Sequence, residues 1–254
     1  MLPQAGLDPL DMQRVKREVG RERVLATPPE GPERAMYLSG LGLSLQARYL
    51  RLGDPADLDA AVAVGEEAVR RTPDEHPARA GRLLNLGAAL LERFARSQQL
   101  DDLDRSVVVH QGAVASPGPA WLAAAQANLG ISLALRAQQT LSLTDLDEAI
   151  ASSNAAVAAT AADHPSRARR LSNLAISLRR RFERTQDDAD LDQAVSTSDR
   201  AVDALPVDHP DRAALLANLA VCLRLRYQRT GDQADRAGAV SLWRSASRIS
   251  AAPA

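Results

Sequence analysis

Aromatic residues and cysteine are scarce in this sequence. Phe, Trp and Tyr together account for 3% of its 254 residues, so the hydrophobic core has to be built from Leu, Ala and Val. Because Ala and Leu are strong helix formers, the composition favours an all-α chain. The single cysteine, Cys222, excludes an internal disulfide framework and a zinc site built from cysteine ligands.

An excess of one charge and a long hydrophobic run are also missing. The 31 basic and 32 acidic residues nearly cancel, which argues against a nucleic-acid partner because such a domain carries a basic excess. No apolar run reaches the ~18 residues that a membrane span needs, and the first twenty residues lack the apolar core of a signal peptide. We therefore expect a soluble, cytoplasmic protein without a membrane partner.

Five copies of one pattern follow one another along the chain. Four copies contain Asn-Leu followed by Gly or Ala, and the first copy reads Gly40-Leu41-Gly42. The third positions of this step are residues 42, 87, 130, 175 and 220, so successive copies are 43 or 45 residues apart. A register held over five copies is the signature of a repeat architecture.

An Arg and an Asp keep fixed places in every copy, six and fifteen residues after the third position of the step. The arginines are Arg48, Arg93, Arg136, Arg181 and Arg226, and the aspartates are Asp57, Asp102, Asp145, Asp190 and Asp235. We expect each Arg to pair with this Asp or with carbonyl groups at a helix end.

Each copy predicts two helices. In residues 165–185, Leu171, Leu174 and Leu178 recur at spacings of three and four, which is typical of a helix with one buried side. The second helix opens on an Asp or Ser with an acidic residue three positions later, a pattern similar to a capping box. The sequence therefore predicts an all-α, right-handed α-solenoid of antiparallel helix pairs, with one N-terminal cap helix followed by five pairs.

The spacing also predicts where the repeats begin and end. We expect a single solenoid over residues 1–250, in which 8–32 form the cap helix and its linker. The helix pairs occupy residues 33–76, 77–118, 119–164, 165–209 and 210–250, and residues 251–254 form a tail. His76, His164 and His209 each precede a Pro at a predicted helix start, so we interpret them as helix-entry residues rather than catalytic ones.

The helix pairs resemble tetratricopeptide (TPR) repeats. Leu86-Gly87 in a first helix, and Ala194, Ala201 and Pro206 in a second helix, stand where that family has the same residues. The unit of ~45 residues is longer than the usual 34. With its phrases LGxxLxxRF and DHPxRA it is similar to the TPR arrays of actinobacterial proteins that often precede a CHAT (caspase-like) protease domain. No caspase-like domain follows Arg248, so the resemblance implies an interaction scaffold and leaves its ligand open.

Asparagines on the first helices are the strongest candidates for binding a partner. The resemblance implies that first helices line a concave groove and that an Asn before Leu-Gly grips the backbone of a bound peptide, to which a carboxamide can both donate and accept. Alternatively, each Asn hydrogen-bonds the backbone of the adjoining repeat, the arginines outside the repeated register lie on a solvated face, and the Trp packs against its neighbours. The predicted partner-binding residues are Asn85, Asn128, Asn173, Asn218, Arg179, Arg180, Arg224, Ile131 and Trp121.

A second hypothesis is a small-molecule sensor or biosynthetic enzyme that holds a hydrophobic ligand near the third repeat. Its pocket would be lined by His110, Trp121, Gln126 and Asn128. However, the sequence contains no phosphate-binding Gly loop, metal-ligand cluster or nucleophile elbow. We therefore favour a non-catalytic scaffold for a protein or peptide partner, without catalytic residues, metal or cofactor. Self-association through the terminal helices is a third hypothesis.

Overall fold

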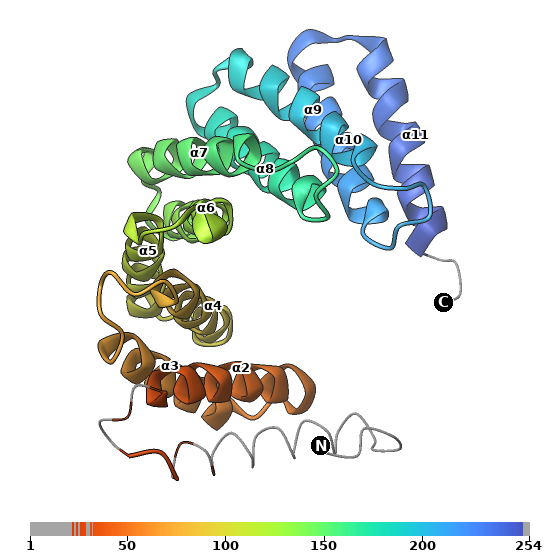
Figure 1. Ribbon diagram of the computed structural model, residues 1–254. Coiled ribbons are helices and arrows are strands. Elements are labelled where there is room, and N and C mark those ends of the chain that lie inside the picture. The colour runs from red at the N-terminus through yellow and green to blue at the C-terminus, as the bar shows by residue number, and fades with distance from the viewer. Residues whose placement is uncertain (1–21, 23, 25, 29–30, 32, 251–254) are drawn as a thin grey trace. The chain divides into compact units, whose positions relative to one another are not determined.

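The computed structural model describes residues 22, 24, 26–28, 31 and 33–250. All regular structure among them is helical, which confirms the predicted all-α class. The expected cap helix lies largely outside the described residues. Of the residues of this region that are described, Glu22, Val24 and Ala26 are helical. Figure 1 shows the helices in chain order.

The chain divides into two compact units, residues 1–128 and 129–254. The first unit contains α2 (Arg34–Leu52), α3 (Pro55–Arg70), α4 (Arg79–Ser97), α5 (Leu100–Ala115) and the short 3-10 helix η1 (Pro119–Trp121). Helix α6 (Leu122–Thr140) begins in the first unit and ends in the second. The second unit continues with α7 (Leu143–Ala158), α8 (Arg167–Thr185), α9 (Asp188–Asp203), α10 (Arg212–Thr230) and α11 (Gln233–Ser250).

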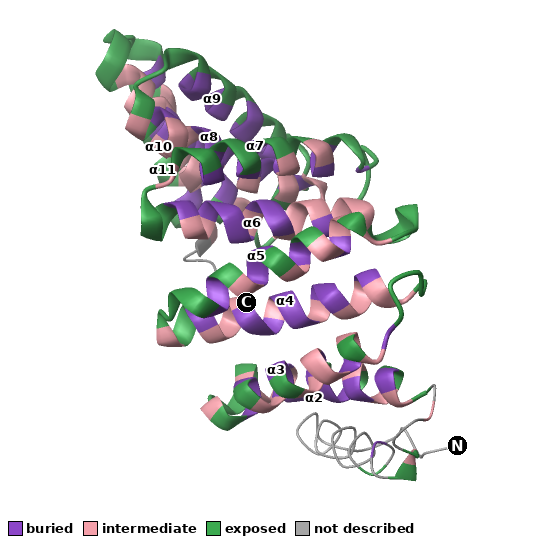
Figure 2. Ribbon diagram, turned by 90° about the vertical axis from the view of Figure 1, so that its left-hand side faces the viewer, coloured by how far each residue is buried: buried purple, intermediate pink, exposed green. Residues whose placement is uncertain are grey.

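Consecutive helices form pairs. We call α2, α4, α6, α8 and α10 the A helices, and α3, α5, α7, α9 and α11 the B helices. Buried and exposed residues alternate along the helices of each unit (Figure 2), because every helix buries one side against its neighbours. The core is aliphatic: Leu58, Leu90, Leu146 and Leu191 are at most 1% exposed.

All five A helices end in a left-handed residue that turns the chain into the B helix, including Leu141 after α6 with φ of 62°. Gly53 and Gly231 have φ of 72° and 76°, as expected for glycine at this position. Gln98 and Gln186 take the same conformation with φ of 57° and 59°, and their amides donate to backbone carbonyls of the helix that they end. Glycine is therefore favoured at this turn but not required.

The recurring Arg and Asp join each A helix to its own B helix, which confirms the predicted pairing. In the fourth repeat, Arg181 donates from Nε to Oδ2 of Asp190 at 2.8 Å and from a terminal nitrogen to Oδ1 at 2.6 Å. The side chain of Asp190 is only 3% exposed, and the hydrogen bonds raise the pKa of Arg181. Two-pronged contacts of this kind recur in the other four repeats.

We expect Asp190→Asn to lower the free energy of unfolding by about 2 kcal/mol, because it replaces a buried charge-assisted bond with a neutral one. Asp147 provides the matched control, since it also bonds Arg181, at 2.8 Å, but is 59% exposed. Asp147→Asn should change stability by less than about 1 kcal/mol. Urea unfolding of both variants measures the difference, and equal losses would contradict a dominant role for the buried pair.

The three His-Pro histidines act at helix entries, as predicted. Nδ1 of His76, His164 and His209 accepts a hydrogen bond from the backbone N–H two residues later, at 3.0 to 3.1 Å. An arginine at the start of the A helix completes the junction, since Arg167 donates to the carbonyls of Val157 and Thr160. It thereby satisfies carbonyl groups that the end of the preceding B helix leaves free.

The small residue after Asn-Leu marks the contact between each A helix and its B helix. A Cβ atom added at Gly87 would overlap the ring of His110 on α5, and one added at Gly130 would lie 2.5 Å from Oγ of Ser153 on α7. His110 is completely buried and its Nδ1 lies 3.4 Å from Oγ of Ser106. Gly87 and Gly130 are therefore required by close packing between helices.

Candidate interaction surface

Two of the four predicted asparagines bond the neighbouring A helix. Nδ2 of Asn85 donates to Oγ of Ser39 at 3.1 Å, and Nδ2 of Asn218 donates to Oγ of Ser172 at 3.2 Å. The partner in each case is a serine hydroxyl 46 residues earlier, rather than the backbone that we expected as the alternative. Each asparagine is half-buried and contributes to the stacking of A helices as well as to the surface.

The other two asparagines differ from this pattern. The residue 46 positions before Asn173 is Ala127, which has no hydroxyl, and the Asn173 side chain forms no hydrogen bond to any described residue. Asn173 lines a cavity of about 160 Å³ between α6 and α8, together with Ile131, Ile176 and Arg180. Asn128 is half-buried at the last position of the first unit.

A larger cavity lies beside the Asn218–Ser172 pair, where the N-terminal halves of α8 and α10 meet the turn after α9. Its volume is about 470 Å³, and Arg169, His209 and Asp211 line it together with this pair. The remaining lining residues are Pro165, Ser166, Ala168, Leu205, Ala214 and Leu215. The cavity thus combines an apolar wall with hydroxyl, carboxamide, imidazole and charged groups, a mixture typical of ligand-binding clefts.

The three predicted arginines have different roles. Arg180 donates to the carbonyl of Ala134 at 3.2 Å and to Oε1 of Gln138 at 2.7 Å, and burial lowers its pKa. It therefore ties α8 to α6. Arg179 pairs with Glu183 in the next turn of α8, and Arg224 donates to Gln228 at 3.3 Å on the exposed side of α10.

The residues of the second hypothesis occupy different environments. His110 is 0% exposed, and desolvation lowers its pKa to about 4, so the imidazole is neutral at pH 7. Trp121 is 45% exposed, and its ring lies over Gly81, where an added Cβ atom would be 3.4 Å away. Gln126 is half-buried, and its Oε1 has no hydrogen-bond partner among the described residues. Solvent reaches Trp121 but not His110 in this structure.

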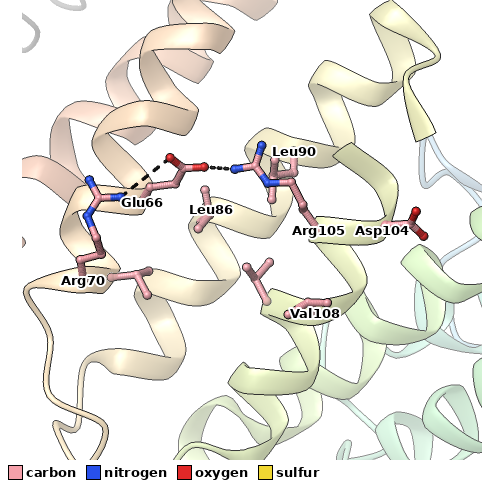
Figure 3. Close-up of a pocket in the computed structure, with 9 residues that line it drawn as sticks. Glu66, Arg70, Leu86, Leu90, Asp104, Arg105 and Val108 are labelled. Atoms are coloured by element: carbon pink, nitrogen blue, oxygen red, sulfur yellow. Dashed lines mark ion pairs between the residues drawn. The ribbon is translucent and has the colours of Figure 1, made fainter. Parts of the chain in front are cut away.

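A further cavity in the first unit lies between α3 and α5, above α4. Its volume is about 390 Å³, and Leu86 and Leu90 of α4 form its apolar floor (Figure 3). Glu66 of α3 pairs with Arg105 of α5 across it, and Val108 is 64% exposed at its edge. No predicted site residue lines this cavity, because all of them except His110 of α5 and Trp121 of η1 lie on the A helices.

Two absences hold for the residues that the structure describes. No helix among them is both long and apolar enough to cross a bilayer. Within the same residues, no group of three or more His, Cys, Asp or Glu is placed to hold a metal ion.

Similar solved structures share this arrangement of helices. The crystal structure of BtubC from P. vanneervenii superposes with a TM-score of 0.63 at 17% identity, covering 95% of this chain and 89% of that one. The nearly identical TPR-like repeats of a Podosopora anserina protein described as a kinesin light chain give 0.61 at 21% identity, covering 87% and 96%. YrrB, described as a TPR protein with an unusual peptide-binding site, gives 0.51 at 16% identity, covering 78% and 80%.

Comparison of the sequence with known sequences gives no match. No protein-family model and no curated protein sequence matches this chain. At these levels of identity the structural likeness establishes the fold and leaves the ligand open. The repeated helix pairs, the Leu-Gly steps and the solved structures together identify the chain as a TPR-type α-solenoid in fold.

Proposed function

We propose that this chain is a non-catalytic cytoplasmic scaffold that binds an extended peptide segment of a partner protein on the A helices of its second unit. The observation that carries the proposal is the hydrogen-bonded pair Asn218–Ser172 at the cavity between α8 and α10. Because Nδ2 of Asn218 is bonded to Ser172, Oδ1 can accept from a peptide N–H while the hydroxyl of Ser172 donates to a peptide carbonyl.

The neighbouring cavity supports a continuous binding surface in the second unit. Asn173 has a carboxamide without a hydrogen-bond partner among the described residues, next to the apolar side chains of Ile131 and Ile176. A peptide that lies across α8 would place backbone groups at Asn218 and Asn173 and an apolar side chain at the isoleucines. Arg179 and Arg224 on the same helices would add a preference for acidic residues.

The sensor or enzyme hypothesis is not favoured. His110, one of the residues of its pocket, is completely buried, and desolvation by burial lowers its pKa to about 4. A general base has to reach the proton that it removes, either directly or through one water.

Selection from an immobilised random peptide library tests the proposal. We expect Asn218→Ala combined with Ser172→Ala to weaken binding of the selected peptides about tenfold or more, because two hydrogen bonds to the peptide are lost. Asn154→Ala is the control, since Asn154 is an exposed asparagine on the B helix α7. Urea unfolding separates a binding defect from a loss of folding, and unchanged peptide affinity in the folded double variant would contradict the site.

A further inference from the structure

The first A helix carries an apolar stripe that is exposed to solvent. Met36, Leu43 and Leu50 expose 51%, 48% and 69% of their surface. Gly40 and Ala47 lie between them, and a Cβ atom added at Gly40 would meet no atom within 4 Å. Spacings of four, three, four and three residues place all five on one side of α2. Monomeric proteins rarely leave a continuous apolar patch uncovered unless it binds something.

The same stripe on later A helices contacts the A helix before it. Asn85 of α4, in the place of Gly40, bonds a serine of α2. Arg180 of α8, in the place of Ala47, bonds the carbonyl of Ala134 on α6. The stripe is therefore the surface through which one A helix stacks on another.

Helix α2 has no such neighbour, since it is the first A helix in the described part of the chain. Its stripe also differs in chemistry from those that are covered. In α8 the stripe contains Asn173 and Arg180, which form or can form hydrogen bonds, whereas in α2 all five residues are apolar or small. The surface that covers α2 has to be apolar and has to match an alternation of large and small residues.

We propose that this stripe binds the same stripe of a second copy of the chain, with the two α2 helices antiparallel about a two-fold axis. In this register Met36 packs on Ala47 of the second copy, and Gly40 packs on Leu43 of the second copy, with the reverse pairs completing the contact. Each of these four layers joins one large to one small side chain, which allows close approach of the helices, and Leu50 lies at the two ends of the contact. A two-fold contact of this kind closes with two copies.

Charges at the ends of α2 fix the antiparallel direction. Glu33 is the residue before the helix, and Arg51 lies in its last turn. An antiparallel pair brings Glu33 of each copy next to Arg51 of the other copy, whereas a parallel pair brings like charges together. Exposed pairs of this type are worth less than about 1 kcal/mol each, so they select the direction more than they add affinity.

Sedimentation equilibrium of the full chain tests the pairing. The contact is small, so we expect a reversible monomer–dimer equilibrium that shifts over about a hundredfold range of concentration. Leu43→Glu should weaken dimerisation by at least about tenfold, because it places a charge in two central layers. Val207→Glu is the control, since Val207 is 78% exposed in the turn after α9, and it should dimerise like the unaltered chain.

Charge reversal and cross-linking test the orientation. Glu33→Arg or Arg51→Glu alone should weaken the dimer, and the two together should restore it. In a Cys222→Ser background, chains with Gly40→Cys should form disulfide-linked dimers when mixed with chains carrying Leu43→Cys, more than either does alone. A monomeric chain over the whole concentration range, as expected if its own N-terminal residues cover the stripe, would overturn the proposal. A dimer that resists Leu43→Glu would overturn it as well.

Discussion

Gly87→Ala is expected to destabilise the folded chain by about 3 kcal/mol, the upper part of the range for overpacking a core. The added methyl group would overlap the imidazole of His110, which is completely buried and cannot swing into solvent. Either the ring leaves its position or α4 and α5 move apart, and both changes disturb packing along the helix pair. Urea unfolding monitored by circular dichroism measures the loss.

A compensating change makes this prediction specific. In the fourth repeat the same two places hold Ala175 and Ser198, both of which are buried. Gly87→Ala combined with His110→Ser copies that pair, so we expect the double variant to recover most of the stability lost in Gly87→Ala. His110→Ser alone is the control and should cost less, because it leaves a cavity but no overlap. A double variant as unstable as Gly87→Ala would show that the ring is not the obstacle.

Acidification is expected to remove about 3 kcal/mol of stability through His110 alone. Desolvation lowers the folded-state pKa of His110 to about 4, whereas an unfolded histidine titrates near 6.5. Between these values the unfolded chain binds a proton that the folded chain does not, so the free energy of unfolding falls as the pH decreases from about 6.5 to about 4. Below pH 4 both states are protonated, and this contribution no longer changes.

Comparison with His110→Ser isolates this effect. Both proteins carry the same aspartates and glutamates, so the acid titration of those groups cancels in the difference between them. We expect the unfolding free energy of the original chain, measured in urea at pH 7, 5.5 and 4.5, to fall more steeply than that of the variant. Parallel pH profiles would mean that His110 is protonated in the folded chain as readily as in the unfolded one.

Patterns that repeat could be predicted from the sequence. The distance of nine residues between Arg181 and Asp190 recurs five times, and such a register indicates an interaction that every repeat needs. The left-handed ends at Gly53 and Gly231 followed from the conformational freedom of glycine. The helix-entry role of histidine followed from its place before proline.

Features that occur once or depend on three-dimensional neighbours could not be predicted in the same way. His110 has no counterpart in the other repeats, and its contact with Gly87 depends on how closely α4 and α5 pack. The bond from Asn218 to Ser172 joins residues 46 positions apart, and nothing local in the sequence marks that serine as its partner. Periodicity gave no sign of the cavity above Leu86 and Leu90, because it depends on the distance between two B helices.

The close contact at Gly87 also bears on how a chain of similar repeats avoids folding incorrectly. During folding, an A helix from one repeat can meet the B helix of another, because the hydrophobic sides of all repeats are alike. The ring of His110 rejects the A helices that carry Ala175 or Ala220 at this place, since only glycine leaves room for it. The ring of His110 thus limits the A helices with which α5 can pair to those that carry Gly42, Gly87 or Gly130 at this place.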